Sequence, residues 1–159
     1  MTFRLLLTAH LLAVIVWIGG MLFVHFALRP AVAEVLQPPE RLRLMASALG
    51  RFFTWVEGSI VVILASGIAM MSLLGQGRGM FAVPAYVHVM FGLGLVMMAI
   101  FGHIRFAAFK RLGVAVAASD WPAAASALGQ IRQLVTVNLG LGLVTTVVGA
   151  VGPAWVTLA

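Results

Sequence analysis

The four histidines of this 159-residue sequence form two pairs with the same spacing. His10 and His25 close the stretch HLLAVIVWIGGMLFVH, and His88 and His103 close HVMFGLGLVMMAIFGH. Fifteen residues of helix rise about 22 Å and leave two side chains about 60° apart, so each stretch places one imidazole near each surface of a bilayer. Neutral imidazole is a common metal ligand, and an ionisable group in an apolar helix marks a functional site by default. The alternative is that each histidine is hydrogen-bonded to a neighbouring helix.

Parallel packing of the two histidine-bearing helices predicts two ligand pairs. His10 then pairs with His88 at the outer depth, and His25 pairs with His103 at the inner depth. Two imidazoles at each depth suit two b-type haems with bis-imidazole ligation, so haem b at two per chain is the expected cofactor. Copper is the alternative ligand of the same histidines.

Glycines and arginines near these histidines fit the same hypothesis. Small residues are expected to make room for the porphyrins at Gly19, Gly20, Gly92, Gly94 and Gly102. Arg29 and Arg105 are placed to pair with the propionates of the inner haem. Helix tilt or a distortion at Gly19-Gly20 is needed to turn both histidines inward.

Glu57 is the only acidic residue at membrane depth. It is a candidate for proton transfer or for binding a quinone head group, and the alternative is an ion pair with Arg51 or another nearby cation. No residue is predicted to be catalytic, and an electron-transfer protein is favoured over a stand-alone enzyme.

The composition requires membrane-spanning elements to position these groups. Hydrophobic residues make up 63% of the chain and charged residues only 9%, which excludes a soluble globular protein. Long apolar segments predict one all-α domain, residues 1–159, that forms a bundle of four transmembrane helices. The expected spans are about 5–28, 52–74, 82–105 and 133–156.

Cysteine and charge restrict the partners. The absence of cysteine excludes disulfides, thiolate metal sites and covalent haem attachment. The net charge of +6 comes from basic residues at the ends of the spans, so the expected partner is the lipid bilayer and not nucleic acid. The positive-inside rule puts the two arginine-rich loops in the cytoplasm and both termini outside, which predicts a bacterial inner membrane protein with its N-terminus outside.

An internal repeat explains the paired histidines. The segment ASALG occurs at residues 46–50 and 125–129, and its displacement of 79 residues is close to the displacement of 78 residues between the histidine pairs. We therefore expect two parallel two-helix repeats, residues 1–78 and 79–159. Short helices are predicted ahead of the second and fourth spans, one beginning at Pro38 and one capped by Asp120.

Three segments carry a family resemblance. HLLAVIVWIGG, the Arg-Pro pair after the first span, and RQLVTVNLGLGLVTTVVG resemble the CopD-like four-helix membrane proteins, a wider group that includes HemJ-type protoporphyrinogen oxidases. The resemblance implies a four-helix bundle with a role in copper handling or in haem-associated redox chemistry. It carries over only to His10 and to the segment from Trp17 to Gly20.

The leading functional hypothesis is a membrane-bound dihaem cytochrome b that transfers electrons across or within the membrane. Such a protein would work with quinone or with redox partner subunits, including as the haem-bearing anchor of a larger oxidoreductase. The alternatives are a CopD-type copper transport or resistance protein and a HemJ-type protoporphyrinogen oxidase.

Overall fold

The computed structural model describes the backbone of residues 1–79 and 82–158 and the side chains up to residue 154. The described residues form helices joined by short turns, and four of these helices are long and apolar enough to cross a membrane. These spans run over Thr2–Val35, Pro38–Leu74, Ala85–Ala117 and Trp121–Ala154. Each predicted span lies within one of them apart from the ends of the third and fourth, so the expected all-α membrane fold is confirmed.

We call each of these four spans a rod. Two of the rods contain π-helical turns. The first consists of α1 (Thr2–Val14), η1 (Ile15–Gly19), α2 (Gly20–Phe23), η2 (Val24–Leu28) and α3 (Arg29–Val35), and the third consists of α5 (Ala85–His103), η3 (Ile104–Ala108) and α6 (Phe109–Ala117). The second and fourth rods are uninterrupted helices, α4 (Pro38–Leu74) and α7 (Trp121–Leu158).

The short helices expected ahead of the second and fourth spans are the first turns of α4 and α7. Pro38 is the first residue of α4, as predicted, and a proline is tolerated there because the first backbone N–H has no helical acceptor. Asp120 accepts a hydrogen bond at Oδ1 from the backbone N–H of Ala123 at 3.0 Å, which confirms its predicted role as a cap. Both helices then continue into the span without a break, so they are not separate interfacial helices.

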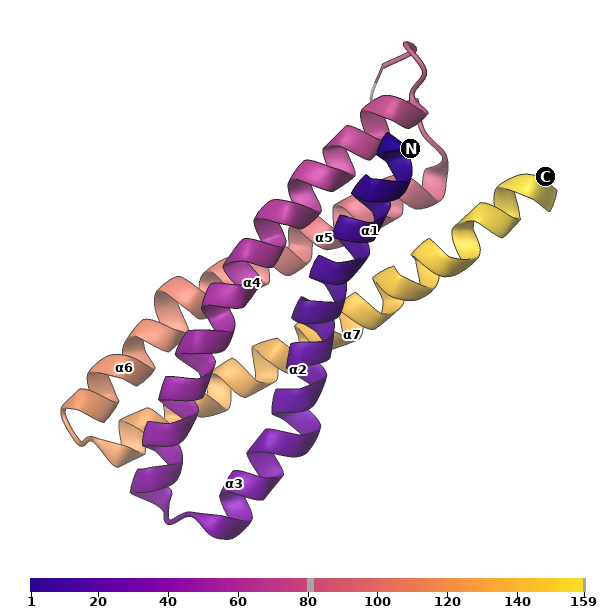
Figure 1. The fold of residues 1–159 in the computed structure, drawn as a ribbon. Coiled ribbons are helices and arrows are strands. Elements are labelled where there is room, and N and C mark those ends of the chain that lie inside the picture. Colours follow the sequence, from indigo (N-terminus) through magenta and orange to yellow (C-terminus); the bar gives the residue numbers. More distant parts are fainter. Residues whose placement is uncertain (80–81, 159) are drawn as a thin grey trace.

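The rods pack as two antiparallel pairs. Helix α1 packs mainly against α4, and α5 packs mainly against α7. Both termini and the α4–α5 turn lie at one end of the bundle, and the α3–α4 and α6–α7 turns lie at the other end (Figure 1). We call the latter the arginine end, because Arg29, Arg41, Arg43, Arg111 and Arg132 belong to the residues around these two turns. The C-terminal part of α7 diverges from the other helices (Figure 1).

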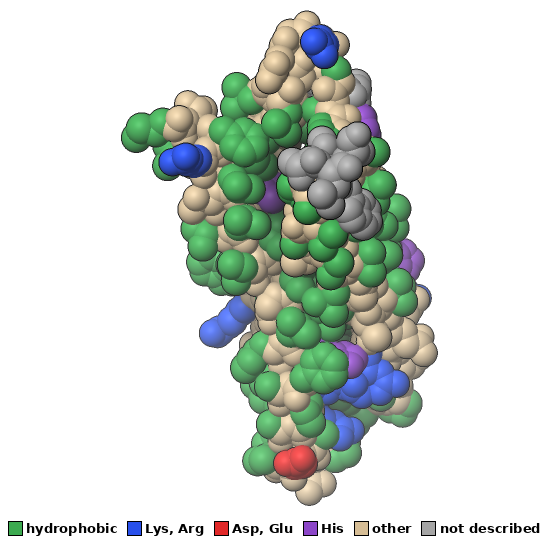
Figure 2. Space-filling view, turned by 90° about the vertical axis from the view of Figure 1, so that its right-hand side faces the viewer, with side chains coloured by type: hydrophobic (Ala, Val, Ile, Leu, Met, Phe, Trp, Pro, Cys, Tyr) green, Lys and Arg blue, Asp and Glu red, His purple; other side chains and the backbone are tan. Residues whose placement is uncertain are grey.

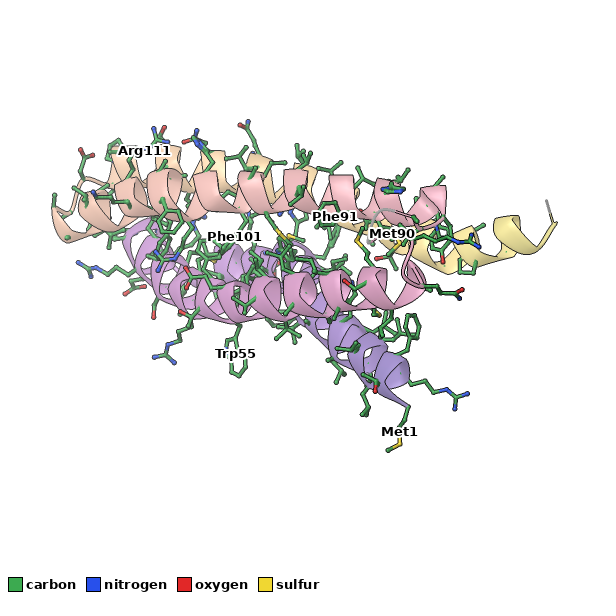
Figure 3. All side chains as sticks on the ribbon, turned by 90° about the horizontal axis from the view of Figure 1, so that it is seen from above. Met1, Trp55, Met90, Phe91, Phe101 and Arg111 are labelled. Atoms are coloured by element: carbon green, nitrogen blue, oxygen red, sulfur yellow. The ribbon has the colours of Figure 1, made fainter. Side chains whose placement is uncertain are left out.

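Aromatic residues dominate the packed interior. The ring of Phe53 contacts Phe101 and Phe109 at centroid distances of 5.6 and 5.2 Å, and Phe101 also contacts Trp17 at 6.1 Å. Figure 3 shows Phe101 between the helices and Trp55 pointing away from them. This cluster joins α4, α5, α6 and the first rod, so it fixes the positions of the histidine-bearing helices relative to each other.

The outer surface is suited to lipid. Figure 2 shows hydrophobic side chains over most of one face, with charged groups gathered mainly toward the ends. Leu12, Phe23, Trp55 and Val61 are all at least 59% exposed, although each lies in an apolar span. An exposed apolar band of this kind is stable only in a hydrocarbon environment, so the chain is an integral membrane protein.

Candidate functional site

His10 is held against α4 by a hydroxyl group. Its Nδ1 lies 2.9 Å from Oγ of Ser66, and the same Ser66 hydroxyl donates its single proton to the backbone carbonyl of Val62. Because that proton is committed, Ser66 accepts a hydrogen bond from the Nδ1–H group of His10. We therefore assign to His10 the tautomer that carries the Nε2 lone pair, the form found in metal-ligating histidines.

His25 makes the same kind of contact with α7. Its Nδ1 lies 3.5 Å from Oγ1 of Thr136, and Thr136 donates its proton to the carbonyl of Arg132 at 2.9 Å. The contact is long, so it orients the ring only weakly. Both histidines of the first rod therefore direct Nδ1 to a hydroxyl on a neighbouring helix.

His88 and His103 lie on an exposed side of α5. The packing of α5 against α7 places Met97 at Gly142 and Met90 at Gly149, and in this antiparallel register His103 is level with Thr136. Since His25 contacts Thr136, His25 and His103 lie at a similar depth, as the predicted inner pair requires. Direct ligation by either predicted pair stays a prediction.

π-Helical turns mark the two inner histidines. His25 lies within η2, and His103 directly precedes η3. A further π-helical turn, η1, ends at Gly19, one of the two glycines at which a distortion was the alternative to helix tilt. Such turns are rare and are frequent at functional sites, because the extra residue changes the direction of the side chains that follow.

The glycines expected to make room for porphyrin differ in their surroundings. A Cβ atom at Gly20 would overlap the ring of Phe52, so this glycine makes room for a side chain of α4. No atom lies within 4 Å of a Cβ placed at Gly19, Gly92, Gly94 or Gly102, so these positions are open.

Glu57 and Arg105 pair with each other. Nε of Arg105 donates to Oε1 of Glu57 at 2.6 Å, and the guanidinium of Arg105 also lies 5.6 Å from the ring centre of Phe109. Glu57 therefore forms the ion pair that was the alternative to a role in proton transfer or quinone binding. Its partner is Arg105 and not Arg51. Arg105 is therefore engaged with protein groups in this structure, and its predicted contact with a propionate would require it to leave Glu57.

Sulfur atoms and an amide lie in the interior between the two levels of histidine. Met21 and Met97 are only 2% and 3% exposed, and Asn138 is 1% exposed with no hydrogen-bond partner for its Oδ1. The sequence alone predicted no role for Ser66. A serine beside Gly67 in an apolar helix was the available signal for Ser66.

The described residues contain no group of three or more histidine or carboxylate side chains that could hold a metal ion. A metal site in this bundle must therefore use two histidines or add softer ligands such as thioethers.

Comparison with known proteins gives one match. The model of the family described as Copper resistance protein D matches residues 46–152, about two thirds of the chain. No curated protein and no solved structure matches the sequence.

Proposed function

Because this chain belongs to the copper resistance protein D (CopD) family, we propose that it is a membrane protein of copper handling that carries cuprous ions through the bilayer. Cuprous ions prefer imidazole and thioether ligands, and the chain has histidine and methionine but no cysteine. The family supports copper as the cargo in preference to the electron transfer that the sequence favoured.

The observation that carries this proposal is the orientation of His10 and His25. Each directs Nδ1 to a hydroxyl whose proton is already donated to a backbone carbonyl. This arrangement keeps the Nε2 lone pair available to a metal without burying a charge. His10 would bind the ion at the outer depth, and His25 would bind it at the inner depth.

Two buried thioethers lie between these histidines. Ile18 and Met97 meet at Gly142, so Met97 is level with Ile18, and Met21 follows Ile18 by one turn on the same rod. Along the axis of the first rod, the level of Met97 lies about 12 Å from His10. Met21 lies about 5 Å beyond that level, and His25 lies about 6 Å beyond Met21. Soft donors at these levels would shorten the distance that an ion travels through an apolar core.

A transport assay tests the proposal. The full chain in liposomes that contain a cuprous-ion indicator is expected to take up copper under reducing conditions, faster than empty liposomes. His10→Ala, His25→Ala and Met97→Leu are each expected to lower the rate at least tenfold, whereas Met98→Leu, which changes a half-buried neighbour, is the matched control. Equal rates for the wild type and for His10→Ala/His25→Ala would contradict the proposal.

A second candidate function is ligation of two b-type haems by the predicted histidine pairs. For the inner pair, His25 and His103, it is favoured by their common depth and by the π-helical turn at each. Bound haem would supply one-electron chemistry, and the protein would hold the iron and exclude water. A reducible Soret and α band with about two haems per chain, and loss of the outer haem alone in His88→Ala, would support this function. A colourless protein that binds copper would contradict it.

A further inference from the structure

Three arginines from three helices converge at the arginine end. Arg29 is the first residue of α3, Arg41 is the fourth residue of α4, and Arg132 lies in α7. The positive charges of Arg132 and Arg41 both act on Arg29. We call these three residues the arginine cluster.

The helix register independently supports the closeness of Arg29 and Arg132. The first rod and α7 are antiparallel, and His25 contacts Thr136 between them (Figure 1). Arg29 lies four residues, about one turn, after His25 on the first rod. Arg132 lies four residues before Thr136 on α7, so the two arginines are at the same level. The register thus places Arg29 and Arg132 on neighbouring positions of the two helices.

No carboxylate compensates this charge. Of the four acidic residues, Glu57 pairs with Arg105, Asp120 caps α7, and Glu34 and Glu40 are exposed. Within the described part of the chain, no member of the arginine cluster forms an ion pair. Like charges that face each other destabilise a fold unless an anion lies between them.

A hollow beside the cluster offers room for such an anion. It has a volume of about 300 Å³ and is lined by His25, Phe26, Arg29, Pro30 and Ala33. All five residues belong to the first rod, and they combine apolar side chains with the imidazole of His25 and the guanidinium of Arg29. The side chain of Phe26 is 67% exposed, so the apolar side of the hollow continues onto the lipid-facing surface.

We propose that the arginine cluster and this hollow form a binding site for the phosphate of an anionic phospholipid of the phosphatidylglycerol type. Guanidinium groups bind phosphate oxygens through two parallel hydrogen bonds, and the phosphate would supply the counter-charge that the three arginines lack. The site lies where the first apolar span ends, which is the depth of a lipid head group, and Phe26 would contact the glycerol and upper acyl region. The inference does not rest on the copper function, although His25 belongs to both proposed sites.

Lipid titration of the purified full chain tests the site. Delipidated protein in detergent is titrated with phosphatidylglycerol, phosphatidylcholine or inorganic phosphate, and bound ligand is counted by native mass spectrometry. Phosphatidylglycerol is expected to bind more tightly than phosphatidylcholine. Each change of Arg29→Gln or Arg132→Gln is expected to weaken phosphatidylglycerol binding about fivefold, since each basic residue near an anionic lipid surface contributes about that factor.

Matched variants keep the test decisive. Arg51→Gln removes the same charge from an exposed position of α4 outside the cluster, and it is expected to leave the affinity unchanged. Arg29→Lys keeps the charge but not the paired hydrogen bonds, so its affinity for phosphatidylglycerol is expected to lie between those of the wild type and Arg29→Gln. It also replaces the glutamine variants in the test if they do not fold. Equal weakening by Arg51→Gln and Arg29→Gln would overturn the site. Cluster-dependent binding of inorganic phosphate as tight as that of phosphatidylglycerol would overturn the lipid as its ligand.

Discussion

Ser66 decides which nitrogen of His10 a ligand can reach. Its hydroxyl accepts from Nδ1 only because its own proton goes to Val62. The bond therefore orients the ring and sets the tautomer together. Partners of this kind commonly change metal affinity by about 10- to 100-fold when they are removed.

Ser66→Ala is accordingly expected to lower cuprous-ion affinity at least tenfold while leaving His10 in place. The measurement is competition with a colorimetric cuprous chelator. Ser72→Ala is the control, because the exposed Ser72 hydroxyl bonds only to the carbonyl of Ile68 in its own helix. Unchanged affinity in Ser66→Ala would show that the hydroxyl has only a packing role.

Asn138 raises a second question at this scale, because its buried Oδ1 has no partner. Removal of an unpaired buried acceptor relieves a desolvation cost, so Asn138→Leu is expected to raise the free energy of unfolding by about 1–2 kcal/mol. Denaturing-detergent titration of the purified protein measures this change. Thr146→Val, which removes an exposed hydroxyl bonded to its own helix, is expected to have little effect. A less stable Asn138→Leu would indicate that the amide has a partner in the membrane.

At the scale of the elements, glycine sets how closely the first rod approaches α4. A Cβ at Gly20 would overlap the Phe52 ring, whereas a Cβ at Gly19 meets no atom within 4 Å. The two adjacent glycines thus have different roles. Only Gly20 is required for the close approach of the helices.

Gly20→Ala is expected to cost about 1–3 kcal/mol of stability, because Phe52 must move within a packed interior. Gly19→Ala is expected to be neutral or slightly stabilising, since alanine favours the helix. The same denaturing-detergent titration compares the two variants. Similar losses in both would mean that helix flexibility, and not packing, is what these glycines provide.

Local signals predicted the elements well. Apolar length identified the four spans, and Asp120 followed by Pro122 identified the start of α7, because a cap depends on only a few neighbouring residues. Continuous helices from Pro38 and from Trp121 were not predicted, since polar residues in their first turns resemble a separate surface helix. Partners across helices, such as Ser66 for His10, depend on rotation and register that a single sequence does not encode locally.

The sequence also could not predict which charged residues contact each other across helices. Glu57 was expected to pair with a nearby cation or to act on protons or quinone, and it pairs with Arg105, 48 positions away. The sequence likewise did not predict that Arg29 and Arg132 lie at the same level, because the two residues belong to different rods. Sequence spacing identifies which residues are unusual, and tertiary packing decides what they touch.

At the scale of the whole molecule, the rods are longer than a bilayer requires. Helix α4 has 37 residues, which span about 55 Å, while the hydrocarbon core is about 30 Å thick. The ends of the bundle therefore project into the head-group layers or the solvent. From the positive-inside rule we predict that the arginine end faces the cytoplasm.

The cysteine-free sequence makes this orientation directly testable. Ser119→Cys at the α6–α7 turn and Gln76→Cys at the α4–α5 turn place single thiols at opposite ends, both exposed. In intact cells a membrane-impermeant maleimide is expected to label only the Gln76→Cys protein, and lysis is expected to expose the other. Labelling of Ser119→Cys in intact cells would reverse the assigned orientation.

The unbroken course of α4 has a mechanical consequence. Ser66, which holds His10, and Arg41, which belongs to the arginine cluster, lie 25 residues apart on one stiff rod, a separation of about 37 Å. A metal bound at Nε2 of His10 would act through the His10–Ser66 hydrogen bond on one end of α4, whose other end carries Arg41 of the proposed lipid site. Copper binding at the outer level and lipid binding in the opposite leaflet would then be coupled through the tilt of α4.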